Sequence, residues 1–352
     1  MTAHDSIAVC CERDRRVWDS CAQTYEKRIV GGHPDVTAYE GFEHCLVEHL
    51  VLHLVRDCAR TLHLYDFGCG SGRFHRALAP WLSSCMAGDD DESVAGTGNE
   101  GGIAHIGGVD FSVDMIDLAR ERLKEEGLAH LHPCHLSFDS GSAFDVPPYD
   151  GPCTPLALSV CNSVGVMQGP EGARKLLGCM RRYVERQRGI ALVSCYRREA
   201  VRDYALSNYE STMDVSGQPC WLEPAPAESS DQVLVPHRYK RARDTDPGIV
   251  VDVHNAAGRC MVRGLHLRRN EKKVQQVVES GSIETWGEYR SHWYGEAQVR
   301  EWMRELWCGA QLWHFTGSAL DVLGGEPAQI AIADFSGAFA SLARRWGLNP
   351  LS

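Results

Sequence analysis

The sequence predicts an α/β protein built on a mostly parallel β-sheet with helices on both faces. Two observations carry this prediction. Short apolar runs alternate with amphipathic helical patterns through residues 61–204, and such alternation is typical of consecutive βαβ units. A cluster of glycines stands directly after the first apolar run, where a strand of such a sheet turns into a helix. The chain of 352 residues, 43% of them hydrophobic, is long enough for a large core.

The expected elements follow one another in a regular order. Two helical patterns, at residues 17–29 and 41–58, precede the first strand and form an N-terminal cap. Strands are expected at residues 62–67, 103–112, 131–138, 155–167 and 189–196, and two more at 311–323 and 327–335. Helices are expected at residues 74–82, 113–127, 171–187 and 295–307. The expected sheet therefore has seven strands.

Two segments interrupt this alternation. Residues 87–102 are acidic and rich in glycine, so we expect a surface insertion without chemistry. Residues 205–290 contain a stretch rich in proline, serine and glycine, then a hairpin and a further strand, which together indicate an inserted antiparallel lid. We therefore expect a helical cap at residues 1–60, a core at 61–204, the lid at 205–290 and a return to the core sheet at 291–352.

Charge and cysteine content narrow the class of protein. Lysine and arginine number 36 against 47 aspartates and glutamates, a net charge of −11, so we expect no nucleic-acid partner. The 15 cysteines include no CxxC pair, so we expect buried, reduced thiols and no metal site. The sequence has no signal-peptide pattern and no apolar run of membrane-spanning length. We expect a cytoplasmic protein without a membrane partner.

The sharpest motif is the run Asp66-Phe67-Gly68-Cys69-Gly70-Ser71-Gly72. Glycines at such a turn allow positive φ and leave no Cβ between the backbone and a ligand at the helix N-terminus. The spacing departs from the GxGxxG of dinucleotide sites, and no Lys-Ser/Thr pair follows to make a phosphate loop. Taken alone, the motif fits either a ligand site or a tight connection.

Asp110 ends the second expected strand, within Gly-Val-Asp-Phe-Ser. A carboxylate at that position can accept hydrogen bonds from both hydroxyls of a ribose. The alternative is that Asp110 caps the next helix, a role for which Ser112 is also placed. Combined with the glycine turn, Asp110 favours a nucleoside site.

These segments together resemble the class I S-adenosylmethionine-dependent methyltransferases, which have a Rossmann-like sheet. LYDFGCGSGRF is similar to the first motif of that family, IGGVDFSVDMIDLARERL to the second, and SFDSGSAFDVP to the third-strand segment. The Cys-Asn-Ser in LALSVCNSVGVMQ resembles the Gly-Asn-Ser of glycine and sarcosine N-methyltransferase-like enzymes. The likeness covers about residues 61–200, whereas residues 205–290 carry no matching motif.

The resemblance implies S-adenosylmethionine as cofactor, S-adenosylhomocysteine as product, and methyl transfer to a small molecule, with N-methylation of an amine or amino acid favoured. Asp66 would face the methionine amino group, and Asp110 would hold the ribose. The other matching positions would line the methionine, the adenine or the floor of the site. The expected cofactor-binding residues are Tyr25, Asp66, Gly68, Cys69, Gly70, Gly72, Asp110, Phe111, Met115, Asp139, Ser140, Cys161 and Asn162. Met115 as a core residue, Asp139 as a turn residue and Asn162 as a buried structural amide are the alternatives.

Methyl transfer mainly needs alignment and exclusion of water, so the sequence names no fixed catalyst. The candidates for catalysis are Tyr25, in a place where similar enzymes set an aromatic lid, Tyr196 at the end of the fifth strand, and His292 after the hairpin. The candidates for acceptor binding under the lid are Arg197, Trp293 and Tyr294. A structural role is the alternative for each of them.

Other functions stay open. A non-catalytic S-adenosylmethionine-binding protein would carry the same motifs. A nucleic-acid methyltransferase, acting on a cap or a tRNA, would need a basic groove, which the acidic charge disfavours, and no Asn/Asp-Pro-Pro-Tyr/Phe motif is present. Arsenite methylation would need grouped thiols, and an NAD-linked oxidoreductase would need a different glycine spacing. A homo-oligomer is compatible with the sequence.

Overall fold

The computed structural model describes two compact units of the chain. The described residues are 15, 18, 19, 22, 34–86, 101–128, 135–167, 169–197, 222–223, 233–236, 249–256, 259–267, 285–320, 322 and 325–351. The core unit comprises Ala38–Val164, Gly172–Cys195 and Ala297–Ser352. The second unit comprises Met1–Thr37, Gly165–Glu171 and Tyr196–Glu296. The expected acidic insertion at 87–102 lies outside the described residues except for its last two.

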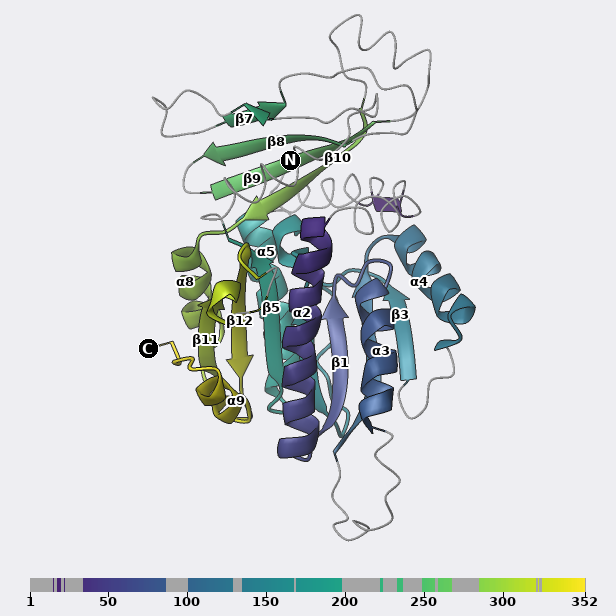
Figure 1. Ribbon diagram of the computed structural model, residues 1–352, viewed down its shortest axis with the longest axis vertical. Helices are drawn as coiled ribbons and strands as arrows, with labels where there is room; N and C mark the ends of the chain where they lie inside the picture. The colour runs from purple at the N-terminus through teal and green to yellow at the C-terminus, as the bar shows by residue number, and fades with distance from the viewer. Residues whose placement is uncertain are drawn as a thin grey trace, which may run out of the picture. The chain divides into compact units, whose positions relative to one another are not determined.

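The core unit is organised around a seven-stranded sheet in the order β11-β12-β5-β4-β1-β2-β3. The neighbouring strands from β5 through β4, β1 and β2 to β3 are all parallel, whereas β11 and β12 are antiparallel to each other. In Figure 1 the arrow of β12 points opposite to that of β1. The predicted Rossmann-like, mostly parallel sheet is confirmed. Its strands are β1 (Thr61–Phe67), β2 (Gly102–Asp110), β3 (His135–Ser140), β4 (Thr154–Ser159), β5 (Ile190–Tyr196), β11 (Gln311–Thr316) and β12 (Ala328–Asp334).

The order of the strands reverses at β1. The chain runs outward from β1 through β2 to β3 on one side, and β4 and β5 lie on its other side. Open α/β sheets place their ligands at the carboxyl ends of the strands beside such a reversal. The register sets Phe67 of β1 opposite Val109 of β2, and Asp66 opposite Leu158 of β4. Three strand ends therefore meet where a ligand is expected.

Helices cover both faces of this sheet, and α2 and α3 are drawn in front of it in Figure 1. Alternate side chains of β1 point to opposite layers: the carboxylate of Asp66 lies 3.5 Å from His75 of α3, and the ring of Tyr65 stacks on that of Tyr183 of α5 at 5.5 Å. The helices are α2 (Pro34–Leu52), α3 (Arg73–Met86), α4 (Val113–Glu125), α5 (Gly169–Glu185), α8 (Glu296–Leu306) and α9 (Phe339–Arg345). A π-helical turn, η2 (His53–Asp57), extends α2.

Several boundaries differ from the sequence prediction. The strand expected at 155–167 ends at Ser159, and a 3-10 turn, η5 (Ser163–Val166), follows. The strand expected at 311–323 ends at Thr316 and passes into another 3-10 turn, η8 (Gly317–Leu320). Both runs are largely apolar on either side of the observed strand end, and apolarity does not separate a buried strand from a buried turn. The helix α9 was not expected from the sequence.

The second unit contains a five-stranded sheet in the order β10-β9-β8-β7-β6, in which every neighbouring pair is antiparallel. The hairpin expected here consists of β8 and β9, whose last pair is Ala256 with Arg259. The strands are β6 (Leu222–Glu223), β7 (Val233–Pro236), β8 (Ile249–Ala256), β9 (Arg259–Leu267) and β10 (Thr285–Trp293). Within the described parts of the chain, no helix has the length and apolarity to cross a membrane.

Three histidines lie side by side on neighbouring strands of the core sheet. The register aligns His63 of β1 with His105 of β2, and His105 with His135 of β3. The rings of His63 and His105 stack at 4.3 Å. Burial, followed by the charges of its two neighbours, lowers the pKa of His105 to about 4. Charging this stack on the folded protein is therefore unfavourable.

This histidine stack predicts a loss of stability in acid. Because the pKa of His105 is lower in the folded chain than in the unfolded chain, its contribution is complete above about pH 6.5 and disappears toward pH 4. His105→Phe keeps a ring but removes the titration, so its free energy of unfolding should fall less than that of the wild type between pH 7 and pH 5. Buried carboxyls with a raised pKa make the folded protein more stable as the pH falls, which opposes the effect of His105. The measurement is therefore the change in free energy of unfolding between pH 7 and pH 5, from urea unfolding, compared between variant and wild type. Equal falls in both proteins would contradict this prediction, and the exposed His49→Phe serves as the control.

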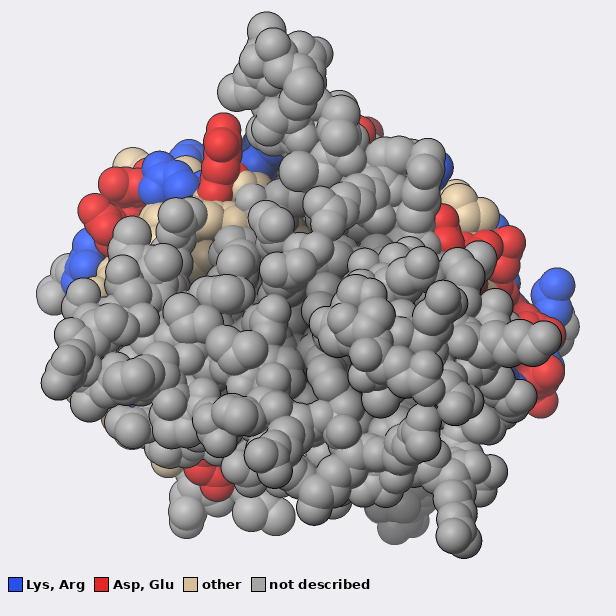
Figure 2. Space-filling model, turned by 90° about the horizontal axis from the view of Figure 1, so that it is seen from above, with Lys and Arg blue, Asp and Glu red and all other residues tan. Residues whose placement is uncertain are grey.

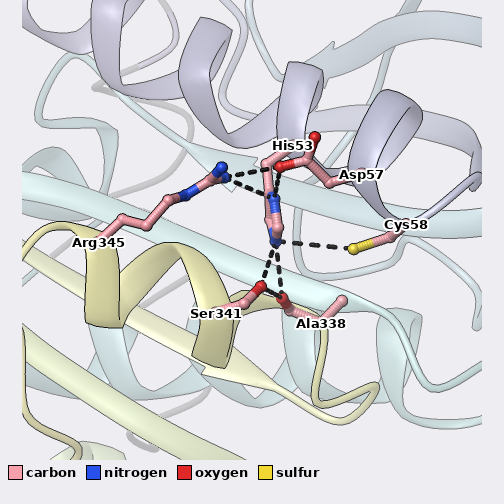
Figure 3. Close-up of polar contacts among 6 residues, drawn as sticks. All are labelled: His53, Asp57, Cys58, Ala338, Ser341 and Arg345. Atoms are coloured by element: carbon pink, nitrogen blue, oxygen red, sulfur yellow. Dashed lines mark hydrogen bonds and ion pairs between the residues drawn. The ribbon is translucent and has the colours of Figure 1, made fainter.

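A polar cluster around His53 joins the end of α2 to α9 (Figure 3). The Nε2 atom of His53 lies 2.9 Å from the carbonyl oxygen of Ala338 and 2.9 Å from the Ser341 hydroxyl. The Nδ1 atom lies 2.7 Å from the Asp57 carboxylate, to which Arg345 also donates at 2.8 Å. Hydrogen bonds from His53 and Arg345 lower the pKa of Asp57. His53 and Asp57 are four residues apart in this helical turn, a spacing that brings their side chains together.

We expect His53→Ala to lower the free energy of unfolding by about 2–4 kcal/mol, because it leaves a cavity in place of a buried ring and removes that ring's hydrogen bonds. His49→Ala, one turn earlier on α2 and exposed, should change it by less than about 0.5 kcal/mol. Denaturant unfolding of both variants tests this. Equal stabilities of the two variants would show that the cluster contributes nothing.

Candidate functional site

The glycine turn leaves β1 and enters α3 through three left-handed residues, Gly68, Gly70 and Gly72, at φ +103°, +52° and +68°. The amides of Gly68 and Cys69 both donate to the carbonyl oxygen of Val109, at 2.9 and 3.0 Å. The turn is therefore held against the end of β2 by the backbone. Positive φ at these positions explains the glycines, because other residues are strained there.

The glycines of this turn have different surroundings. A Cβ on Gly70 would meet no atom within 4 Å, so Gly70 faces open space. A Cβ on Gly72 would lie 2.6 Å from the ring of Phe138 on β3. Packing against Phe138 is therefore enough to explain glycine at position 72, without a ligand. Gly70 is the glycine whose surroundings leave room for a ligand.

Asp110 fastens the glycine turn from the neighbouring strand. One carboxylate oxygen accepts from the Gly70 amide at 2.9 Å, and the other accepts from the Ser112 amide at 2.9 Å. Ser112 itself is the N-cap of α4, and its hydroxyl accepts from the Met115 amide. Asp110 thus points to the glycine turn, at the place where a ligand of an open α/β sheet is expected.

Asp66, at the end of β1, is a buried carboxyl with an unmatched oxygen. It is 2% exposed, and its Oδ1 atom makes no hydrogen bond. Burial, followed by the charges of Glu43 and Asp110, raises the pKa of Asp66 well above its usual range. Burial also lowers the pKa of the nearby His75 to about 3, so that ring is neutral at pH 7 and does not supply a compensating charge. A cationic hydrogen-bond donor would satisfy Asp66.

The floor beside Asp66 is the turn after β4. Cys161 and Asn162 both have left-handed backbones, at φ +54° and +57°. Such conformations are uncommon outside glycine and gather at functional sites. The Ser163 hydroxyl donates to the Gly68 carbonyl oxygen at 3.0 Å, which joins this turn to the glycine turn.

Sequence reasoning missed Glu43 of α2, which lies under that floor. Both of its carboxylate oxygens accept from the Cys161 amide, at 2.9 and 3.0 Å. A signal was present in the sequence. Tyr39, Phe42, Leu46 and Leu50 form the apolar stripe of α2, and Glu43 falls within the same stripe at helical spacing. A carboxyl on the buried face of a helix calls for a partner or a function.

The remaining cofactor candidates lie along the ends of β2 and β3. Asp139 and Ser140 are exposed and stand opposite Val109 and Asp110 in the sheet register. The Tyr65 hydroxyl donates to the Asp139 carboxylate at 3.5 Å. Met115 is buried on α4, whereas Phe111 is half-buried before that helix. These positions follow one strand edge next to Asp110, and their contact with a nucleoside stays a prediction.

The candidates for catalysis and acceptor binding belong to the second unit. A parallel bridge pairs Arg197 with Tyr294, and the Arg197 guanidinium lies 3.4 Å from the Glu296 carboxylate. Tyr294 is fully buried and Tyr196 is half-buried. His292 and Trp293 lie in β10, but their side chains are outside the described residues, and so is Tyr25.

Two observations concern other kinds of site. Among the described residues there is no group of three or more histidine, cysteine, aspartate or glutamate side chains that could hold a metal ion. On the face shown in Figure 2, the described lysines and arginines are interspersed with aspartates and glutamates at the rim, and they form no continuous basic patch. A basic groove is what a nucleic-acid partner would need.

Comparisons with known proteins give matches among solved structures only, since no family model and no curated protein matches. An S-adenosylmethionine-dependent methyltransferase from Clostridium acetobutylicum is 10% identical, with a TM-score of 0.49 over 90% of this chain and 98% of that one. The CcbJ methyltransferase from Streptomyces caelestis is 13% identical, with a TM-score of 0.49 over 89% and 95%. An amino pentose methyltransferase from Micromonospora echinaspora, with S-adenosylmethionine bound, is 14% identical, with a TM-score of 0.40 over 82% and 89%. At these identities the likeness concerns the fold.

The different surroundings of the glycines predict different effects of substitution. Gly70→Val and Gly127→Val both place a side chain at positive φ in open space, so each should lower stability by about 1–2 kcal/mol. Gly127 ends α4 away from the turn, and only Gly70→Val should abolish binding of S-adenosylmethionine. Gly72→Ala should be the least stable variant because of the clash with Phe138. Calorimetric titration and thermal unfolding test this, and a folded Gly70→Val that binds would contradict it.

Proposed function

We propose that this chain is an S-adenosylmethionine-dependent methyltransferase acting on a small-molecule acceptor. The observation that carries the proposal is the open glycine turn at the reversal point of the sheet, with Asp110 bonded to Gly70 and the unmatched Asp66 oxygen beside it. Ligands of open α/β sheets bind at this place.

The residues of the turn fit the parts of this cofactor. The buried Asp66 carboxyl matches an ammonium group. An ammonium donates hydrogen bonds and would supply the positive charge that the surroundings of Asp66 lack. The Asp110 carboxylate matches the two ribose hydroxyls, because carboxylate oxygens accept hydrogen bonds from hydroxyl groups. The open side of Gly70 leaves room for the sugar and the methionine chain, because no side chain projects there.

The protein's own contribution to catalysis would be positional. When bound, the cofactor supplies an activated methyl group on a sulfonium. Asp66 would hold the amino group of the cofactor and Asp110 its ribose, and the Cys161–Asn162 turn would limit how an acceptor can approach. Such alignment accelerates transfer by converting a bimolecular encounter into an oriented one. A general base is needed only where the acceptor is protonated at the working pH.

Three features support a small acceptor, with N-methylation of an amine or amino acid favoured. The Cys161-Asn162-Ser163 segment is similar to the Gly-Asn-Ser of enzymes that methylate glycine or sarcosine. The net charge of −11 disfavours a nucleic-acid acceptor, which is the second candidate. Asn162 is 5% exposed with a left-handed backbone, as expected for a residue fixed by its site. Tyr25, Tyr196 and His292 remain the candidates for catalysis, and Arg197, Trp293 and Tyr294 those for acceptor binding.

We expect Asp110→Ala to weaken binding of S-adenosylmethionine by about 1–3 kcal/mol, or roughly 5- to 150-fold, because hydrogen bonds to a charged group are lost. Asp114→Ala, an exposed carboxylate in the first turn of α4, is the matched control and should bind like the wild type. Isothermal titration calorimetry measures both. Equal affinities of the two variants would remove Asp110 from the site.

Transfer itself is tested with S-adenosylmethionine labelled on its methyl group. The wild-type protein is incubated with fractions of small metabolites, and labelled products are identified by mass and by position of the methyl group. Label should enter an amine-containing fraction and be absent with Gly70→Val. Cofactor binding without transfer into any fraction would favour a non-catalytic binding protein, and label in added RNA would favour the second candidate.

A further inference from the structure

Glu43 is a fully buried carboxyl on α2. Both of its oxygens accept from the backbone amide of Cys161, and the side chains of Ser194 and Tyr39 also form hydrogen bonds with it. The neighbouring Tyr39 hydroxyl lies 3.0 Å from the Ser194 hydroxyl of β5. These contacts join α2 to β5 and to the turn after β4, at the desolvation cost of a buried carboxyl.

The amide that Glu43 holds belongs to a strained turn. Cys161 and Asn162 are consecutive non-glycine residues with left-handed backbones, which costs on the order of 1–2 kcal/mol for each residue. Surrounding contacts must maintain such a conformation. Glu43 supplies one from below, and the bond from the Ser163 hydroxyl to the Gly68 carbonyl oxygen supplies another from the glycine turn.

Glu43 also acts electrostatically on Asp66. The charge of Glu43 is the largest contribution after burial to the raised pKa of Asp66. Burial raises the pKa of Glu43 itself to about 7. The titratable groups that act on or are affected by Glu43 are Tyr39 on its own helix, Cys161, Cys195 of β5 and Asp66 of β1. Arg73, which also acts on Cys161, forms an ion pair with Glu40.

We propose that Glu43 is a positioning residue of the methyl-transfer site: it holds the Cys161–Asn162 turn and, through its charge, strengthens the binding of the cofactor's ammonium end by the unmatched Asp66 carboxyl. This inference rests on the proposed function. One positive charge at Asp66 would offset the repulsion between the two buried carboxyls and satisfy the free Asp66 oxygen. Binding of an ammonium-bearing ligand should therefore favour the ionised form of Glu43, and affinity should rise as the pH increases from 6 to 8.

Two probes separate this role from general binding of a nucleoside. S-adenosylhomocysteine carries the amino acid end, whereas 5′-methylthioadenosine has the same nucleoside and sulfur without it. Glu43→Gln keeps the shape of the side chain and one acceptor oxygen for the Cys161 amide but removes the charge. We expect it to bind S-adenosylhomocysteine about tenfold more weakly at pH 8, on the scale of one charge-assisted contact, and 5′-methylthioadenosine within about twofold of the wild type.

The pH profile is the second measurement. For the wild type, the ratio of the two affinities should rise from pH 6 to pH 8, and for Glu43→Gln that rise should be smaller. Glu48→Gln, on the same helix and half-buried, is the matched control and should keep the wild-type ratio and its rise. If Glu43→Gln does not fold, the wild-type profile still tests the inference, because a flat ratio overturns it.

The other outcomes are equally decisive. Unchanged binding of S-adenosylhomocysteine by Glu43→Gln overturns the inference. An equal loss of both probes also overturns it, since Glu43 would then support the site without acting on the ammonium. If the wild type binds neither probe, the proposed function fails and the inference with it. If both probes bind but the ratio of their affinities is the same in Glu43→Gln as in the wild type, the inference alone fails.

Discussion

The carboxylate of Asp110 sets the geometry on which the candidate site depends. It accepts one backbone amide from the glycine turn and one from the start of α4, so a single side chain links the exits of β1 and β2. Charge-assisted bonds of this kind are stronger than bonds between neutral groups. Because the glycine turn is also tied to Val109 and to Ser163, the ends of β1, β2 and β4 form one connected frame. Gly70 is the place where that frame stays open.

Near this frame, the core unit contains buried ionisable side chains that lower the stability of the fold. Burial raises the pKa of Glu43 and of Asp66, the charge of Glu43 raises that of Asp66 further, and His75 lies beside Asp66 as a neutral ring. Desolvated carboxyls without a matched cation destabilise a fold. Perturbed groups of this kind collect at sites that bind charged ligands. The strained Cys161–Asn162 turn fits the same pattern, since strain is retained where the surrounding structure and function require it.

Much of the core unit could be predicted from the sequence because its signals are local. Apolar runs and helical periodicity place β1, β2, β5 and α4 within a few residues of their observed ends. Prediction failed where the deciding contact is distant in sequence. The end of β4 depends on Glu43, more than 100 residues away, and the place of α9 depends on contacts such as that of Ser341 with His53. The local sequence pattern in residues 155–167 and 339–345 gives no information about those distant contacts.

By itself, the sequence determined the α/β class, the seven strands, the glycine turn and the carboxylate at the end of β2. Each follows from a pattern of neighbouring residues that restricts backbone conformation or burial. Only the tertiary structure decided which glycine faces open space, which oxygen of Asp66 lacks a partner, and that Glu43 holds the floor of the site. These properties arise from groups that folding brings together from separate strands and helices, so they exist only once the core has formed.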